Sequence, residues 1–153
     1  PEPRIKMIVE LKEGVNLSTL ASEHYRLANE TLVDHILKLN PEITNPNLIL
    51  VGQKIRIPDI TDSLLIIQDP DGLYKIHLRT FADPKSAASY RAAAPWTYKI
   101  DIVPWNVSEQ ETWYRVMTGS YKSRIEALRT VAEMKQKGFS LMPSPGETSW
   151  KKR

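Results

Sequence analysis

The chain has 153 residues, of which 41% are hydrophobic and 25% charged, a globular composition that suits one ordinary domain or two small ones. The sequence has no cysteine and no apolar run near the roughly 20 residues of a membrane-spanning helix, which excludes a disulfide scaffold, thiol catalysis and such a helix. The net charge of +3 is concentrated in residues 73–142, and a basic half is typical both of binding to an anionic or polar polymer and of an ordinary solvated surface.

The first sixty residues predict two strands and two helices in the order β-α-α-β. These elements are predicted over residues 5–11, 17–25, 30–39 and 54–57. Asn16 and Asn29 each stand one residue before a helix, where an Asn side chain caps the first free backbone N–H groups. The second helix stops at Asn40-Pro41, and the last strand stops at Pro58.

Two motifs in this region are specific. The segment G-Q-x-I-x-I-P closes the region at residues 52–58, and the Asn40-Pro41 pair lies eleven positions before its glycine. Together with the element order, and with Gly14 and Leu17 before the first helix, these residues resemble the LysM domain over residues 5–58. The resemblance implies a module that binds glycans containing N-acetylglucosamine, chiefly peptidoglycan and chitin.

The resemblance also implies a shallow glycan groove between two loops, one before the first helix and one after the second. Carried over position by position, the groove residues are Gly14, Val15, Asn16, Leu17, Asn47, Leu48 and Ile49. Backbone groups there would hold an acetamido group, and an apolar side chain would take its methyl. The alternative is that Leu17 and Ile49 belong to the core and that Asn16 only caps a helix.

Residues 59–72 do not have the composition of a flexible linker. Residues 64–67 are all apolar, and Asp69-Pro70-Asp71-Gly72 is a strong turn sequence. We expect an additional strand here, which pairs with the next strand or packs under the first domain. The two domains would then be held at a fixed angle.

The second half contains an internal repeat with a period of forty residues. Residues 74–81 and 114–121 share the form Y-[KR]-[IV]-x-x-x-[ST]-[FY], and each is followed by a helix cap, Asp83 or Ser123. Each half therefore predicts strand, helix, strand, with second strands over residues 97–103 and 139–142. The fold class is α+β: a β-α-α-β domain, then a ferredoxin-like β-α-β-β-α-β sheet with both helices on one face.

This repeat, with Tyr-Arg-Val at residues 114–116 and Ser-Arg-x-Glu-Ala at residues 123–127, resembles the SPOR domain. The resemblance covers residues 73–143 and implies a peptidoglycan-binding module of the bacterial envelope. SPOR domains use the sheet face away from the helices and bind glycan strands that have lost their stem peptides. We therefore expect the domains at residues 4–58 and 73–143, a structured linker at 59–72 and a basic tail at 144–153.

Strand alternation predicts which side chains occupy that free face. They are His77, Arg79, Trp105, Trp113 and Arg115. Indole rings stack on the C–H faces of sugars, and basic and hydrogen-bonding groups bind hydroxyl and acetamido groups, so this set predicts a second glycan site. The alternative is that Trp105 or Trp113 is buried by the linker or by the first domain.

The functional prediction is noncatalytic binding of peptidoglycan glycan strands through two linked modules that anchor or target a parent envelope protein, in the periplasm. We expect no enzyme activity, metal or cofactor, since His24, His35 and His77 form no ligand motif, and the close carboxylate pairs, Glu109 with Glu111 and Asp59 with Asp62, are assigned to loops. One alternative is a protein-interaction adaptor that has lost its glycan sites, through the departures from the family patterns at Val15, Asn16, His77 and Arg79. A weaker alternative is an RRM-like RNA binder, which would stack bases on the same face.

Overall fold

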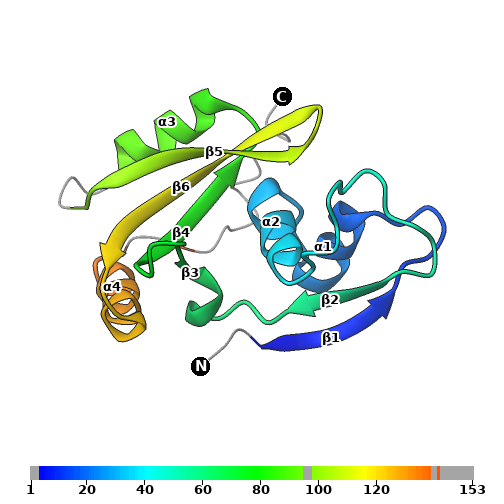
Figure 1. The fold of residues 1–153 in the computed structure, drawn as a ribbon, viewed down its shortest axis with the longest axis horizontal. Coiled ribbons are helices and arrows are strands. Elements are labelled where there is room, and N and C mark those ends of the chain that lie inside the picture. The colour runs from blue at the N-terminus through cyan, green and yellow to red at the C-terminus, as the bar shows by residue number, and fades with distance from the viewer. Residues whose placement is uncertain (1–3, 95–97, 139–140, 142–153) are drawn as a thin grey trace.

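The computed structural model describes residues 4–94, 98–138 and 141. Its elements are β1 (Ile5–Glu10), α1 (Leu17–Tyr25), α2 (Glu30–Lys38), β2 (Lys54–Pro58), the 3-10 helix η1 (Asp62–Leu65), β3 (Ile66–Gln68), β4 (Tyr74–Phe81), α3 (Pro84–Ala93), β5 (Ile100–Ser108), β6 (Glu111–Tyr121) and α4 (Arg124–Gln136). Figure 1 shows them in two halves, with β1, α1, α2 and β2 in one half and the larger sheet with α3 and α4 in the other.

The first half has the predicted β-α-α-β order. β1 and β2 form an antiparallel pair, and the two helices pack together on it. Both predicted N-caps are confirmed, because the side chain of Asn16 accepts from the Thr19 N–H and that of Asn29 from the Leu32 N–H. Asn40 fixes the end of α2 by donating to the carbonyl oxygens of Ile36 and Arg56.

The second half is a four-stranded antiparallel sheet in the order β3-β4-β6-β5. The predicted caps of its helices are confirmed, since Asp83 accepts from the Ser86 N–H and Ser123 from the Glu126 N–H. α3 and α4 pack on the same sheet, and the core between them includes Ile76, Leu78, Val116, Val131 and Met134.

β3 comes from the segment between the two halves. It pairs with β4 through Ile66, Ile67 and Gln68, and it takes the edge position next to β4 that a ferredoxin-like sheet gives to its last strand. The strand predicted over residues 139–142 lies outside the described residues except for Leu141, which is buried in the core beneath the sheet.

The chain between β5 and β6 differs from the sequence prediction. β5 runs to Ser108, well beyond the predicted end at Val103, and a tight turn at Glu109 and Gln110 leads directly into β6. The expectation that Glu111 lies in a loop is wrong, because it begins β6, and Asp62 likewise begins η1. This long β5–β6 hairpin reaches across to the first half of the molecule (Figure 1).

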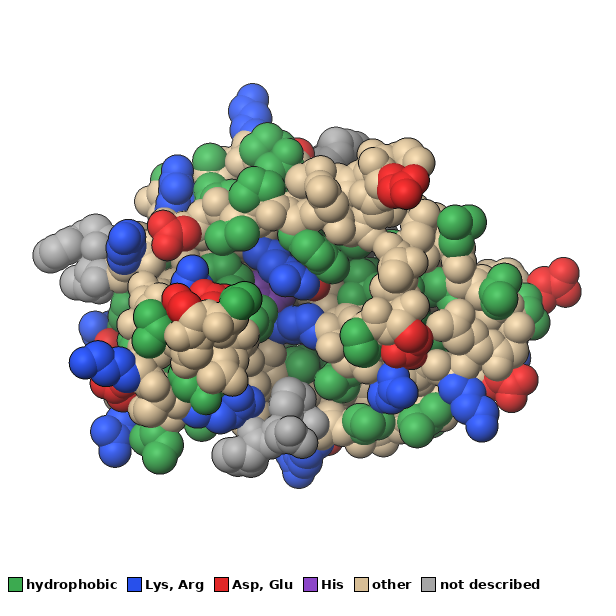
Figure 2. All heavy atoms as spheres, in the orientation of Figure 1, with side chains coloured by type: hydrophobic (Ala, Val, Ile, Leu, Met, Phe, Trp, Pro, Cys, Tyr) green, Lys and Arg blue, Asp and Glu red, His purple; other side chains and the backbone are tan. Residues whose placement is uncertain are grey.

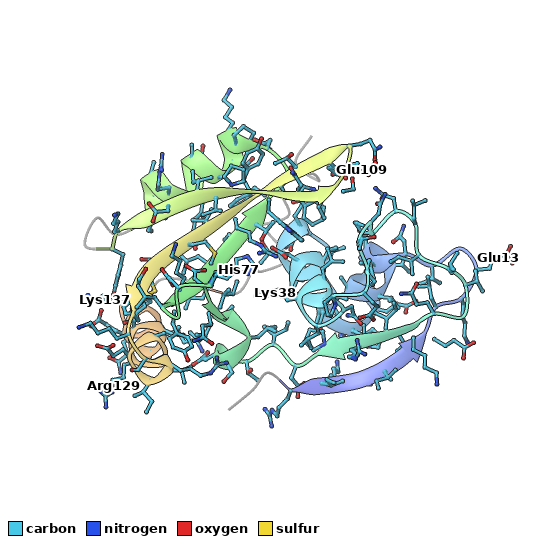
Figure 3. The ribbon with its side chains drawn as sticks, in the orientation of Figure 1. Glu13, Lys38, His77, Glu109, Arg129 and Lys137 are labelled. Carbon is cyan, nitrogen blue, oxygen red and sulfur yellow. The ribbon has the colours of Figure 1, made fainter. Side chains whose placement is uncertain are left out.

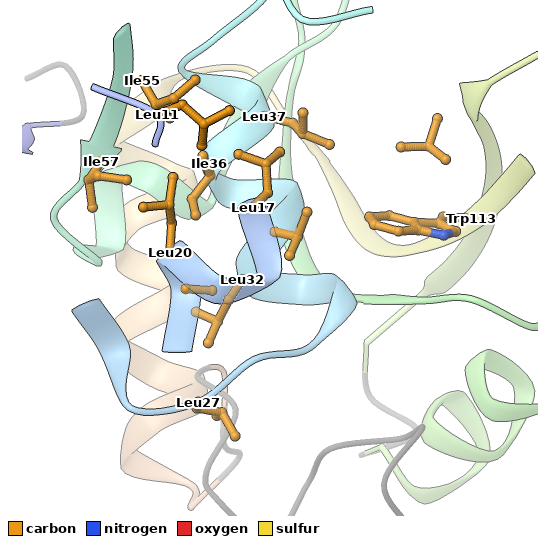
Figure 4. Packing of buried hydrophobic residues seen from close by; sticks show 13 residues of the cluster. Leu11, Leu17, Leu20, Leu27, Leu32, Ile36, Leu37, Ile55, Ile57 and Trp113 are labelled. Carbon is orange, nitrogen blue, oxygen red and sulfur yellow. The ribbon is translucent and has the colours of Figure 1, made fainter. Parts of the chain in front are cut away.

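The core of the first half extends into this hairpin. Its buried residues are Leu11, Leu17, Leu20, Ala21, Leu27, Leu32, Val33, Ile36, Leu37, Ile55 and Ile57, with Val107 of β5 and Trp113 of β6. Figure 4 shows Trp113 at the margin of the cluster, on the side away from Ile55 and Ile57. The two halves therefore share one hydrophobic cluster. Within the described part of the chain, no helix is long and apolar enough to cross a membrane.

Candidate functional site: the loops of the first half and the covered sheet face

The loop before α1 presents the first set of predicted groove residues. Gly14 has a φ of +80°, a conformation that glycine adopts without strain, and both Gly14 and Asn16 are exposed. Val15 is half-buried against the core, and Leu17 is fully buried in it. Leu17 is thus a core residue, and only a small part of its side chain reaches the surface.

The loop after α2 presents the second set. Asn47 and Leu48 are exposed, Leu48 with 75% of its surface accessible, while Ile49 is half-buried against the core of the first half. The backbone N–H of Asn47 donates to the side chain of Asn45, which holds the turn. Within the described residues, the side-chain amide of Asn47 has no hydrogen-bond partner.

A hollow of about 140 Å³ brings these two loops together. It is lined by Asn16, Leu17, Ser18, Val33, Pro46, Asn47, Glu111 and Trp113. Of the predicted groove residues it contains Asn16, Leu17 and Asn47, whereas Val15 lines a separate hollow beside β1 and α1, and Leu48 and Ile49 line a third one beside residues 42–45.

The prediction from sequence missed Ser18, Val33, Pro46 and Glu111 as lining residues of this hollow. Ser18 and Pro46 each neighbour a residue that was predicted. Glu111 stands two residues before Trp113 on one strand, so both side chains lie on the same face of the sheet. That spacing is the feature of the sequence from which Glu111 could have been predicted as a lining residue.

Trp113 is not the exposed ring that the free-face prediction assumed. Its exposed fraction is 8%, because it packs into the core of the first half, and its indole N–H donates to Glu111 Oε2 at 2.8 Å. Trp105 meets it edge to face, with ring centroids 6.2 Å apart. Of the two readings of these tryptophans, burial by the first domain is therefore the correct one for Trp113, and Trp105 is half-buried against the same cluster.

Apart from the burial of Trp113, side chains alternate between the two faces of the sheet as predicted, up to the middle of β4. Tyr74, Ile76 and Leu78 face α3 and α4, and so do Tyr114 and Val116 of β6. His77 and Arg115 lie on the opposite face, where they contact α2. The expectation that this face is open is wrong for β4, because α2 of the first half packs against that strand, whereas Val103 of β5 on the same face is 39% exposed.

Arg79 is on the other face from the one predicted. A β-bulge shifts the register between His77 and Arg79, so that His77 pairs with Met117 but Arg79 pairs with Val116. One extra residue reverses the alternation, and Arg79 therefore turns toward α3, where its guanidinium lies 5.1 Å from the centre of the Tyr90 ring. Thr80 takes the place on the α2 face that was assigned to Arg79.

A buried carboxylate, Asp34 of α2, joins the two halves at this face. Its Oδ1 accepts from Arg115 Nη2 at 2.7 Å, and its Oδ2 accepts from Arg115 Nε at 2.9 Å and from Thr80 Oγ1. Asp34 is fully buried, and the bidentate geometry is the strong form of an Arg–carboxylate pair. Arg115 also stacks over Trp105, with 3.9 Å between its guanidinium carbon and the ring centre.

Lys38 and His77 continue this network, and they lie side by side between α2 and β4 in Figure 3. Lys38 Nζ contacts His77 Nδ1 at 2.9 Å and donates to the carbonyl oxygen of Leu64, while His77 Nε2 contacts Thr80 Oγ1 at 2.7 Å. A neutral His77 ring that accepts a hydrogen bond from Lys38 carries its proton on Nε2 and donates a hydrogen bond to Thr80. The network lies at the junction of the two halves, where Figure 2 shows basic side chains gathered.

Burial controls the protonation of this network. Desolvation lowers the pKa of Lys38 to about 7, despite the opposing attraction of Asp34. Desolvation, with repulsion from Lys38, also holds the pKa values of His35 and His77 well below the ordinary 6.5. The two histidine rings meet edge to face at 5.1 Å, and neither ring nitrogen of His35 has a hydrogen-bond partner among the described residues. Both histidines are therefore neutral at pH 7.

The side chains described above can bind a ligand through polar contacts and apolar surface. In the described ranges, no group of three His, Asp or Glu side chains is placed to hold a metal ion. The Asp59 and Asp62 carboxylates form ion pairs with Arg4 and Lys135, respectively. The hollow between the loops instead combines an amide, a hydroxyl, a carboxylate and an indole, which are groups that bind sugars.

Comparison with known proteins identifies both halves. Residues 11–58 match the LysM domain and residues 70–142 match the SPOR domain, as predicted. An endolysin of Bacillus phage PZA is 48% identical over 48 residues, which are 31% of this chain and 17% of the endolysin, and the match falls in the LysM region. The chain thus spans less than a fifth of that relative. No solved structure matches the chain.

LysM and SPOR domains are binding modules that associate with the bacterial cell wall or envelope. The chain carries a LysM domain followed by a SPOR domain, two peptidoglycan-binding modules joined here by a shared core and a buried ion-pair network.

Proposed function

We propose that this chain binds the glycan strands of peptidoglycan without cleaving them, and that it anchors or targets a parent envelope protein in the periplasm. The glycan site in this proposal is the groove of the LysM domain, formed by residues 14–17 and 47–49. One observation carries the proposal: the hollow that joins the two LysM loops is open, whereas His77 and Arg115 of the SPOR sheet face are engaged by side chains of α2.

The groove suits a neutral sugar polymer. Asn16 is exposed at the N-terminus of α1, where it caps the helix, and the exposed amide of Asn47 supplies donors and an acceptor on the opposite side. Leu17 and Val33 line its floor and give apolar surface for an acetamido methyl. A hollow of about 140 Å³ is smaller than the roughly 300 Å³ of a typical small-molecule site, so the groove holds only part of a glycan strand and the affinity is modest.

Glycan binding by the sheet face stays a prediction. His77 and Arg115 are engaged with Asp34 and Lys38, so they reach a glycan only if α2 leaves the sheet. The same cover lies over the surface that an RRM-like RNA binder would need for base stacking. The LysM groove therefore carries the proposal, and the sheet face requires a second, open arrangement of the domains.

Sedimentation with purified sacculi tests the proposal. The intact chain is expected to pellet with the sacculi and to release no soluble muropeptides. Asn16→Asp with Asn47→Ala should abolish most of the pelleting, since the Asp keeps the helix cap but both amide donors are lost. Asn106→Ala is the matched control, because Asn106 is an exposed asparagine of β5 outside the hollow.

Treatment of the sacculi with an amidase distinguishes the two surfaces. The SPOR resemblance implies a preference for glycan strands that have lost their stem peptides. The proposed LysM groove instead contacts the sugar backbone, which the amidase leaves intact. We expect pelleting to change little after the treatment, since His77 and Arg115 of the sheet face are engaged by α2. A large gain in pelleting that persists in the Asn16 and Asn47 variant would move the glycan site to the SPOR sheet, and release of muropeptides would show an enzyme.

A further inference from the structure

We propose that the glycan groove of the LysM domain is completed by the SPOR domain, with Glu111 and Trp113 of β6 forming a wall of the groove and contacting the sugar. The proposal rests on the proposed function, because the ligand is the same N-acetylated glycan. It adds that the two modules build one composite site across their interface.

The first support is the composition of the hollow. Six of its lining residues come from the LysM domain and two, Glu111 and Trp113, come from the SPOR domain. Among the described residues, this hollow is lined from both LysM loops and from the hairpin, whereas the hollow at Val15 and the hollow at Leu48 are each lined from one loop. A glycan strand that lies between Asn16 and Asn47 therefore contacts Glu111.

The second support is the way in which the carboxylate is held. Glu111 is exposed, and its Oε2 accepts the indole N–H of Trp113 at 2.8 Å. Trp113 is itself more than nine-tenths buried, so its ring is a fixed support. One hydrogen bond leaves the carboxylate with acceptor capacity for two adjacent hydroxyl groups or an acetamido N–H, and the orientation is already set before the ligand arrives.

The third support is the rigidity of the hairpin against the LysM domain. Val107 and Trp113 are part of the LysM core, and the bidentate pair between Arg115 and Asp34 ties β6 to α2. The hairpin is thus held at the groove by apolar packing and by a buried ion pair. Sites built on such fixed elements position their ligand groups more accurately than sites on free loops.

The expected ligand class follows from these groups. A carboxylate at the wall favours hydroxyl and amide donors and repels anions, so the site takes the neutral sugar backbone in preference to a carboxylated peptide or a phosphate. The probe is therefore a water-soluble oligomer of N-acetylglucosamine.

Titration calorimetry of the full chain with this oligomer tests the proposal. Glu111→Ala should weaken binding about tenfold, which is the usual effect of losing a hydrogen bond to a charged group. Glu109→Ala is the matched control, since Glu109 is also an exposed glutamate of the same hairpin, lies outside the hollow and is labelled at the hairpin tip in Figure 3. It should bind like the wild type.

A second readout follows the indole directly. The Trp113 indole N–H resonance, assigned by its loss in Trp113→Phe, should shift during the titration, because its acceptor Glu111 gains new partners. If Trp113→Phe does not fold, the surface variant Glu111→Ala still decides the matter.

The possible outcomes separate this proposal from the proposed function. If the wild type and Glu111→Ala bind the oligomer equally and the indole resonance stays in place, the groove belongs to the LysM domain alone and the composite site is wrong, although the function stands. If the wild type binds neither the oligomer nor sacculi, both proposals fail.

Discussion

At the scale of single residues, Asp34 and Arg115 are the pair on which the arrangement of the domains depends. Asp34 is fully buried and holds two of its hydrogen bonds through Arg115. A buried charge whose partner is removed keeps its desolvation cost and loses its compensation. The role that the sequence suggested for Arg115, a sugar contact on an open face, is replaced in this structure by an ion pair between domains.

We therefore expect Arg115→Ala to lower the free energy of unfolding by about 3 to 5 kcal/mol, the usual cost of breaking a buried pair by deleting one partner. Urea denaturation followed by circular dichroism measures it. Arg129→Ala on the exposed surface of α4 is the control and should change stability by less than about 0.5 kcal/mol. Equal stabilities of the two variants would contradict the buried-pair account.

Protonation of the same network predicts how stability depends on pH. The pKa of Lys38 falls from its ordinary value of 10.5 to about 7 on folding, so between these values the unfolded chain binds a proton that the folded chain does not. Stability therefore rises with pH across this interval. Below about pH 6.5, His35 and His77 take up protons in the unfolded chain first, because their folded pKa values are lowered, and stability falls as the solution becomes more acidic.

The groups that face Lys38 are Asp34 on its own helix, Arg115 of β6 and His77 of β4. Unfolding free energies at several pH values between about 5 and 9 should increase throughout that range. Lys38→Met should flatten the rise above pH 7 and leave the fall below pH 6.5. A wild-type curve that matches that of Lys38→Met above pH 7 would show that Lys38 keeps an ordinary pKa.

At the scale of elements, the β5–β6 hairpin decides where Trp113 lies. The hairpin is longer than predicted, and it inserts its apolar face into the LysM core. Deleting a buried Trp side chain leaves a cavity that the neighbours fill only partly. Trp113→Ala should therefore reduce the free energy of unfolding by about 3 to 5 kcal/mol.

Thermal unfolding of Trp113→Ala and of Val103→Ala, its control on the more exposed part of β5, checks this expectation. The control should unfold within a few degrees of the wild type. If the Trp113→Ala protein were as stable as the control, Trp113 would be exposed, as the sequence suggested.

Much of the architecture could be predicted from local sequence patterns. The caps at Asn16, Asn29, Asp83 and Ser123 are side-chain contacts within a few residues of the helix start, so short motifs define them. The repeat at residues 74–81 and 114–121 likewise gave two of the central strands.

What the sequence did not reveal depends on contacts between distant residues. The bulge at His77 and Arg79 has no glycine or proline to mark it, yet it exchanges the faces of Arg79 and Thr80. The packing of α2 on the sheet depends on Asp34, and its role is not visible in the local sequence because its partner Arg115 lies 81 positions further along the chain. The candidate groove was only half predicted for the same reason, because Glu111 comes from the other domain.

At the scale of the whole molecule, two peptidoglycan-binding domains are packed into one unit. The LysM core includes two SPOR residues, and α2 packs against β4 on the sheet face of the SPOR domain. In this arrangement the two modules do not act as independent sites on a tether, so the gain in avidity expected of linked sites does not apply. Among the described residues, the groove at the edge of the interface combines an open surface with sugar-binding groups.

The most direct test of this account maps the glycan site on the intact chain by NMR, with assigned backbone amide and indole resonances and a soluble N-acetylglucosamine oligomer as the titrant. We expect the backbone amide resonances of Asn16, Ser18 and Asn47 to shift together with the Trp113 indole resonance, while those of His77 and Arg115 stay in place. Shifts confined to His77, Thr80 and Arg115, with both LysM loops unchanged, would contradict it and would mean that α2 leaves the sheet so that the SPOR face can bind.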